Sequence, residues 1–410
     1  MNRKQLAILL VLVIVLGGAG LLLRKKQAAS WEGSNPSVGQ KLLGNFPVND
    51  ITRINIKQGT NELNLVKQDD LWRVGERSGY PANYSEISDF LIKARDLRIV
   101  QSEKLGPSQW PRLALIAGQG TNAALEVNFL GQNDKSIKTL LLGKMHTKKS
   151  NRQSPYGDMG GGDWSDGRFV RVGADSDNVV LISETFANIE PRPDLWLDRD
   201  FFKVEKVRSV AIAFPAVTNS WTLTRDTATA EWKLADAKPG EQLDSARTVG
   251  VSNPLSALSF ADVAVSASLE MFGLDKPIVA KLETFDNFTY TVKVGRKTND
   301  NYPLTYTVTA QFPKERTPGK DEKPEDKARL DKEFQETQKK LEEKLAQEKT
   351  GEKWIYLVST WTLDPLLKER SQLFVEKKEE PKKDDKPVST GPATPEGEST
   401  NTPLAEADAA

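Results

Sequence analysis

Two stretches of the chain carry residue types that could do chemistry, and the first is glycine-rich. Segment 157–167 holds Asp158, Asp163 and Asp166. Carboxylates on a loop can hold Ca²⁺, which takes six to eight oxygen ligands. Their spacing differs from the helix–loop–helix calcium motif, and no Gly-Lys-Ser/Thr follows to bind a phosphate. We therefore interpret the segment as a hairpin loop with turn-forming Gly and Asp, and we assign no metal site to it.

The second stretch is a basic cluster beside that loop. It could contact anionic lipid headgroups or an acidic partner surface, although a solvated loop is the favoured interpretation. Its only candidate base is His146, which lies among cations that would disfavour its charged form. No serine or carboxylate around His146 forms a recognisable catalytic set. The cluster consists of Lys144, His146, Lys148, Lys149 and Arg152.

Paired carboxylates and paired tryptophans are the remaining candidates. Hydrolases use two acids about 5–10 Å apart, and adjacent acids occur at Asp69–Asp70 and Glu379–Glu380. With 57 acids in the chain, the sequence cannot select a catalytic pair. Trp72 and Trp232 could stack on sugars, but their equivalent positions near strand ends favour packing. We assign no catalytic, cofactor-binding or metal-binding residue and expect no cofactor.

Composition excludes several classes of protein. The chain has 410 residues, with 57 Lys and Arg against 57 Asp and Glu. That length suggests two or three domains, and zero net charge argues against a nucleic-acid partner held by bulk electrostatics. Cysteine is absent, which excludes disulfides, thiolate zinc sites and cysteine nucleophiles.

The N-terminus has the pattern of a membrane anchor. An aliphatic run from Leu6 to Leu23 lies between Arg3-Lys4 and Arg24-Lys25-Lys26. At about 1.5 Å per residue the run approaches the roughly 30 Å of a bilayer core. A cleaved signal peptide has a shorter apolar stretch. We therefore predict an uncleaved single-pass anchor that contacts the lipid bilayer through residues 6–23. We expect it to lie in the bacterial inner membrane, with the bulk of the chain in the periplasm; a cleaved signal is the alternative.

The body of the chain contains two copies of one pattern. Residues 46–54 align with 202–210, and residues 61–74 with 219–234. Each pair reads as an aromatic residue, alternating apolar strands and a late tryptophan. A helix follows in each copy. In the first it covers Ser85–Leu97, with Ser85 as N-cap and an apolar face spaced i, i+3, i+4 and i+7. In the second, two short helices are expected within 244–258, because Gly250 and Pro254 interrupt the pattern.

A second set of strands completes each copy. Strands are predicted at 124–130 and 136–143 in the first copy, and at 279–285 and 290–295 in the second. Their ends, Leu142-Gly-Lys144 and Val294-Gly-Arg296, match closely. We predict an α+β fold: two tandem repeats of a mainly antiparallel sheet with a helix layer, preceded by one transmembrane helix. The expected divisions are the anchor 1–26, a linker 27–44, the first repeat 45–198, the second repeat 199–375 and a tail 376–410.

Two inserts break the symmetry. The first copy carries residues 145–168, and the second carries the insert 313–353, which contains a charged helix over 325–349. A thin apolar stripe on that helix would suit a groove or a coiled-coil neighbour, so the insert is the best candidate for binding a partner. A self-packed excursion is the alternative. The stripe consists of Leu330, Phe334, Leu341 and Leu345. The Pro/Thr/Glu-rich tail is expected to be disordered.

These features resemble a bacterial family, the domain of unknown function numbered 4340. The resemblance covers residues 1–370, and neither the insert nor the tail is part of it. It rests on the flanked anchor, the two strand-hairpin-Trp units, the matched Gly-Lys and Gly-Arg strand ends and the Arg/Asp-rich lead-in 194–202. It implies a membrane-anchored envelope protein, similar in setting to partners of ABC-2-type export permeases and of the gliding-motility-associated auxiliary protein. It supplies no functional residues.

From this we expect a non-enzymatic accessory or scaffold protein of an ABC-type export system. Its partners would be the bilayer and a membrane protein, either an ABC permease or an auxiliary subunit. An ATPase of the phosphate-loop type is excluded, because the motif is missing. Two alternatives stay open: an envelope module that binds a glycan or peptide in a groove between the two repeats, and a carboxylate-dependent cell-envelope hydrolase.

Overall fold

The computed structural model describes residues 38–374, apart from 121, 149–163, 174–175, 240, 253–254, 266–267 and 320–321. The predicted anchor, most of the predicted linker and the predicted tail lie outside the described residues. Of the helices in the described part, none is long and apolar enough to cross a membrane.

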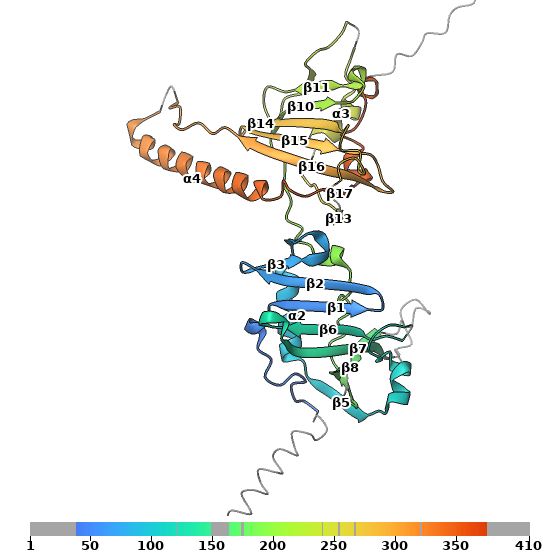
Figure 1. Cartoon of the computed structure of the whole chain (residues 1–410). Helices are drawn as coiled ribbons and strands as arrows, with labels where there is room; N and C mark the ends of the chain where they lie inside the picture. Colours follow the sequence, from blue (N-terminus) through green and yellow to red (C-terminus); the bar gives the residue numbers. More distant parts are fainter. Residues whose placement is uncertain are drawn as a thin grey trace, which may run out of the picture.

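The first half of the chain forms one antiparallel sheet (Figure 1). Its strands alternate buried and half-exposed residues, as in β6, which is the pattern of a sheet with one face on the core. In spatial order the strands are β4 (Tyr80–Pro81), β3 (Leu71–Val74), β2 (Asn61–Gln68), β1 (Arg53–Gln58), β6 (Leu125–Leu130), β7 (Ser136–Lys148), β8 (Trp164–Val172), β9 (Asn178–Ile182) and β5 (Ile99–Lys104).

Helix α2 (Tyr84–Asp96) covers the core face of this sheet. It buries Ile87, Phe90, Leu91 and Ala94, the face predicted from its spacing. The Phe90 ring lies 5.7 Å from that of Phe129 on β6. The predicted N-cap is wrong by two residues, because the side chain of Asn83 accepts hydrogen bonds from the backbone of Ser85 and Glu86.

The second half of the chain forms a second antiparallel sheet, which is drawn above the first in Figure 1. Its helix α3 (Ser245–Ser252) begins after Asp244, whose carboxylate accepts from the backbone of Ala246. No second helix follows among the described residues of 244–258, so that expectation is wrong. In order the strands are β12 (Lys233–Leu234), β11 (Trp221–Thr224), β10 (Val207–Ala213), β14 (Ile278–Thr284), β15 (Phe288–Val294), β16 (Asn301–Ala310), β17 (Tyr356–Ser359) and β13 (Asp262–Val263).

The α+β class with antiparallel sheets is confirmed. The two strand orders correspond position by position from β3 to β5 and from β12 to β13, so β10 takes the place of β1 and β15 that of β7. β4 is extra in the first sheet. Short 3-10 helices fill the connections: η1 (Val48–Asp50), η2 (Gly75–Arg77), η3 (Pro107–Leu113), η4 (Gln132–Asp134), η5 (Pro193–Trp196), η6 (Val217–Asn219) and η7 (Arg370–Leu373), and α5 (Thr360–Leu363) follows β17.

Helix α4 (Pro324–Lys349) lies between β16 and β17 in the sequence and extends away from the second sheet (Figure 1). Leu341 and Leu345, near its C-terminus, pack against the core, and Glu348 is buried. Leu330 and Phe334, nearer its N-terminus, are half-buried and are not part of the core. The predicted helix is confirmed, and only the C-terminal part of its apolar stripe is used by the second sheet.

One glycine is required at the same place in each sheet. A Cβ on Gly143 would lie far inside van der Waals contact with the carbonyl oxygen of Leu113, and one on Gly295 would meet the carbonyl oxygen of Phe272 in the same way. In each half, the connection that leads into the equivalent strands β6 and β14 passes against this glycine. The matched Leu-Gly-Lys and Val-Gly-Arg ends therefore have a packing cause.

We predict that Gly143→Ala and Gly295→Ala each lower the free energy of unfolding by about 1–3 kcal/mol, because the backbone must move to admit the methyl group. Gly106→Ala is the control: a Cβ at Gly106 would have no atom within 4 Å, and the φ of this residue is −65°. Urea denaturation followed by circular dichroism measures all three. Equal midpoints for the wild type and Gly143→Ala would contradict the packing explanation.

Candidate functional site

The joint between the two sheets begins with a link segment, residues 194–203, whose first residues are the end of η5. The segment is paired to the first sheet: Ala82 forms a β-bridge with Leu197, and the Asp198 N–H donates to the Pro81 carbonyl at 3.0 Å. The Asn83 N–H donates to the carbonyl of Trp196 at 2.8 Å. Since backbone pairing fixes the register of an extended segment, the side chains that follow Leu197 have defined positions.

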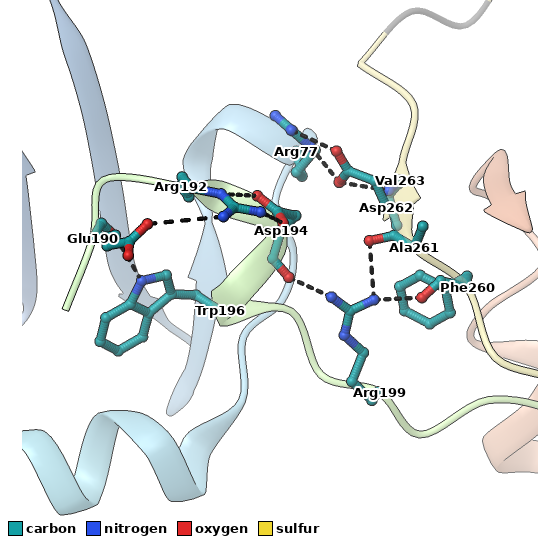
Figure 2. A network of polar contacts seen from close by, with 10 residues as sticks. All are labelled: Arg77, Glu190, Arg192, Asp194, Trp196, Arg199, Phe260, Ala261, Asp262 and Val263. Carbon is teal, nitrogen blue, oxygen red and sulfur yellow. Dashed lines mark hydrogen bonds and ion pairs between the residues drawn. The ribbon is translucent and has the colours of Figure 1, made fainter. Parts of the chain in front are cut away.

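Arg199 connects this segment to the second sheet (Figure 2). Its guanidinium donates to the carbonyls of Phe260, at 2.5 Å, and of Asp194, also at 2.5 Å. It also lies 5.0 Å from the centre of the Phe260 ring. The planar guanidinium group of an arginine has five N–H donors, so it can bind several carbonyl groups at once. The contact joins the link segment to the residues just before β13.

A second connection is an ion pair between η2 and β13. Arg77 donates two parallel hydrogen bonds to Asp262, both of 2.7 Å (Figure 2). The side chains are only 16% and 24% exposed, so the pair is screened less than a surface pair. The hydrogen bond to Asp262 raises the pKa of Arg77. Figure 2 also shows the exposed pair of Arg192 with Asp194, at 2.6 Å.

Aromatic packing fills the space between these polar contacts. Tyr80, from β4 of the first sheet, is buried with its ring 4.7 Å from Trp354 and 5.7 Å from Phe260, both in edge-on arrangements. Burial raises the pKa of the Tyr80 phenol. Edge-to-face pairs contribute about 0.5–1.5 kcal/mol beyond their buried area. The extra strand β4 therefore supplies an aromatic contact between the halves.

The C-terminal end of α4 lies at one side of the joint. The buried carboxylate of Glu348 accepts from the Tyr290 hydroxyl at 2.8 Å and from the Lys344 ammonium at 2.7 Å. It also accepts from the backbone N–H of Lys203 at 3.2 Å. The burial of Tyr290, together with the Glu348 charge, raises the pKa of Tyr290. Each Glu348 oxygen thus has a donor, as a buried carboxylate requires, and α4 is fixed to the link segment.

These elements enclose a cavity of about 360 Å³. The first sheet, the link segment, the second sheet and α4 all contribute to its lining. The lining residues are Tyr80, Pro81, Asp198, Asp200, Phe201, Phe202, Lys203, Tyr306, Lys344, Gln347, Glu348, Thr350, Gly351, Trp354 and Tyr356.

Two carboxylates in this lining lack a cation. Among the described residues, no Lys, Arg or His lies within ion-pair distance of Asp198 or Asp200. Asp198 accepts only the Asp200 backbone N–H, at 3.0 Å. Partial burial raises the pKa of Asp198, and the nearby Asp200 charge adds to this. The joint therefore holds a partly buried carboxylate at some cost to its own folding.

Most of the candidate residues named from the sequence lie away from the cavity at the joint. Asp166 is the partner of His146, with the Nδ1 and Oδ1 atoms 2.5 Å apart, and this contact lowers the pKa of Asp166. The sequence motifs contain no recognisable catalytic set around His146, and they did not identify Asp166 as its partner. Both residues are near the ends of β7 and β8, and no cluster of three or more metal-binding side chains occurs in the described part of the chain. Asp158, Asp163, Lys149, Arg152, Glu379 and Glu380 lie outside the described residues.

The paired tryptophans pack as predicted. Trp72 is 6% exposed, and Trp232 packs against the core with Arg225 4.6 Å from its ring centre. Asp69 and Asp70 form the β2–β3 turn with positive φ values of 49° and 61°. Neither pair lines the cavity at the joint.

Five residues of the joint are not recognisable as a group in the sequence: Arg77, Asp198, Arg199, Asp200 and Asp262. The one signal for them was the Arg/Asp-rich lead-in 194–202, which contains three of the five. Nothing in the sequence relates that lead-in to positions 77 and 262, because the connection is made through space.

The Arg77–Asp262 pair gives a test of the joint. We predict that Arg77→Ala lowers the free energy of unfolding by about 1–3 kcal/mol, because the partly buried Asp262 then loses both guanidinium hydrogen bonds and keeps only the Val263 N–H among the described donors. Arg192→Ala, which breaks an exposed pair, should cost less than about 1 kcal/mol. Chemical denaturation measures both variants. A cost for Arg192→Ala as large as that for Arg77→Ala would contradict the assignment of Arg77 to the joint.

Asp198 gives a second test. A carboxyl whose pKa is raised on folding destabilises the folded state once pH exceeds its ordinary value of about 3.9. Asp198→Asn should therefore raise the melting temperature at pH 7 by about 1–3 °C, and the gain should disappear at about pH 3.5. Differential scanning calorimetry at the two pH values checks this. A lower melting temperature at pH 7 would show that the Asp198 charge is stabilising.

Comparison with known protein families gives a match to the second half of the first sheet and the link segment. Residues 158–277 match a family described as a domain of unknown function (DUF4340). The matched region includes β8, β9, the link segment with Arg199, β10 and Asp262, but neither β4 nor α4. No curated protein and no solved structure matches the chain. The chain is thus similar to this family across the link between its two sheets.

Proposed function

We propose that this protein is a non-enzymatic accessory protein of the cell envelope that holds a partner protein through α4. The observation that supports this is the division of the α4 apolar stripe. Leu341 and Leu345 pack on the core, whereas Leu330 and Phe334 remain partly exposed on the projecting half. An amphipathic helix with apolar residues spaced i, i+4 is suited to a groove on another protein.

Ion pairs support the projecting half of α4, including one from the preceding loop, in which Arg316 pairs with Asp331 at 2.9 Å. Arg329 pairs with Glu333 at 2.8 Å and with Asp326 at 3.1 Å, and Lys332 pairs with Glu336 at 3.8 Å. The side chains of these three pairs within α4 are largely exposed, and each such pair contributes only a few tenths of a kcal/mol. The partner would therefore meet a helix that is already formed, which lowers the entropy cost of binding.

The setting of the protein follows from the sequence. We infer that residues 6–23 anchor it in the bacterial inner membrane, with the two sheets in the periplasm. The partner we propose is the permease of an ABC-type export system or an auxiliary subunit of it, on the basis of the family resemblance. ATP would then be hydrolysed by the partner's ATPase.

A second candidate function is an envelope module for a peptide or glycan. The observation that favours it is the cavity of about 360 Å³ at the joint, which has aromatic and charged residues in its lining. Ligand sites of this size are common where two domains meet. This function is compatible with the first, because the projecting half of α4 does not line the cavity.

We predict that the full-length, tail-tagged protein recovers an ABC permease and its ATPase at near-stoichiometric levels from its native membrane in mild detergent. The double variant Leu330→Glu/Phe334→Glu should reduce that recovery at least tenfold, because charges cannot enter an apolar groove. The readout is quantitative mass spectrometry, with circular dichroism to verify the helix.

The matched control is Ala328→Glu/Gln335→Glu, which adds the same two negative charges at exposed positions of the same helix. It should leave recovery unchanged. Recovery of the wild-type protein alone would exclude a stable complex, and equal loss in both double variants would exclude the apolar stripe as the contact.

A further inference from the structure

A groove runs along one side of helix α2 in the first sheet. It has a volume of about 430 Å³ and lies between α2, η1 and the hairpin of β2 and β3. Its floor is apolar, because Ile51, Trp72, Ile87 and Leu91 are each at most 6% exposed. The groove shares no lining residue with the cavity at the joint, and α4 contributes none to it.

The rim of the groove is also apolar on the α2 side. Tyr84 is 68% exposed and Ile92 is 45% exposed. They lie with Ser88 at positions i, i+4 and i+8, and therefore along one side of the helix. A surface helix normally presents polar residues outward, and single exposed apolar residues need no explanation. Two that flank a groove with an apolar floor indicate a surface that another group covers.

The chain before Val38 supplies a side chain of the right kind. In residues 24–37, Trp31 is the only aromatic or branched aliphatic residue, whereas the tail 376–410 contains no aromatic residue. An indole combines a large apolar body with one N–H donor, which needs a partner when it is buried. Asn49 and Ser88 line the groove and carry acceptor oxygens for that donor. Trp31 thus matches the groove in both its apolar and its polar part.

The segment that contains Trp31 is long enough to reach the groove. The Gly39 N–H donates to the carbonyl of Ile99 at 2.8 Å, so the described chain enters the sheet just beyond the C-terminal end of α2. Ile92 lies within about 16 Å of Ile99, because four helical steps rise about 1.5 Å each and three extended steps about 3.3 Å each. The eight steps from Gly39 back to Trp31 can span up to about 26 Å. Trp31 can therefore reach the Ile92 end of the groove.

We propose that the segment before Val38 returns to the first sheet and buries the Trp31 side chain in the α2 groove, at its Ile92 end. This docking needs neither the α4 contact nor a partner protein, so it goes beyond the proposed function and can fail separately from it. With residues 6–23 in the bilayer, as proposed above, residues 27–31 alone would separate the basic flank of the anchor from the groove. The first sheet would then be held beside the membrane.

The absence of cysteine from the chain allows a cross-linking test on the full-length protein in native membrane vesicles. Ser30→Cys is combined with Ser88→Cys in the groove, and a short bismaleimide joins the two thiols. The control pair combines Ser30→Cys with Ser102→Cys on β5, which is three residues beyond Ile99 and outside the groove. A segment without a docking site would reach Ser102 at least as readily as Ser88. Docking should make the Ser88 pair react about tenfold faster, because it raises the effective concentration of one thiol near the other.

The contribution of the indole is tested in the Ser88 pair. Trp31→Ser should lower the cross-linking rate about tenfold, because the burial of a large apolar side chain is lost, while Asn35→Ser should leave it unchanged. Linked peptides are quantified by mass spectrometry. Equal rates for the Ser88 and Ser102 pairs, or no effect of Trp31→Ser, would overturn the proposal. Cross-links between two chains would assign the groove to a second copy, and no cross-link to Ser88 would place Trp31 elsewhere, as in the interfacial region of the bilayer, where tryptophan is enriched; either result also overturns it.

Discussion

The insertion of Tyr80 between the two sheets is the contact on which the rest of the arrangement depends. Each sheet has its own buried strands, but the candidate cavity exists only where the sheets, the link segment and α4 meet. Tyr80 is 4% exposed and contacts Phe260, Trp354 and Tyr356. Arg77 and Arg199 then fix how the two sheets are oriented at the joint, because hydrogen bonds to fixed acceptors constrain orientation more than apolar packing does. The joint thus combines the burial of an aromatic side chain, which is not directional, with the directional hydrogen bonds of two arginines.

Much of the fold was predictable because it depends on local patterns. Alternation of apolar residues identified nearly every central strand, and the 3.6-residue spacing identified both α2 and α4. The glycine before Lys144 and the one before Arg296 are short-range signals too, since a close backbone approach permits no Cβ. One error concerns a whole element, because the second helix expected within 244–258 does not occur among the described residues. Another lies at an element end. Asn83 displaced Ser85 as N-cap, because capping depends on the backbone angle of a single residue that the pattern does not specify.

The candidate site was not predictable in the same way. Arg77 and Asp262 are separated by 185 positions, and no periodicity relates them. Charged residues are 28% of the chain, so an acid with a structural partner cannot be distinguished by sequence from one without. Asp198 becomes distinctive only when the structure shows that the cations around it are directed elsewhere. The family resemblance depended partly on the Arg/Asp-rich lead-in, but it assigned no function to the residues of that motif.

Glu348 relates the two candidate surfaces to each other. Its side chain fixes the C-terminal end of α4 to Lys203, and its backbone carbonyl accepts from Tyr306 in the cavity wall. A ligand in the cavity would contact the same link segment that holds Glu348, because residues of that segment line the cavity. Coupling between two sites requires an element whose arrangement both of them influence, and residues 198–203 are the element that contacts both the cavity and Glu348. The region similar to the family spans this link, while α4 lies outside the matched residues.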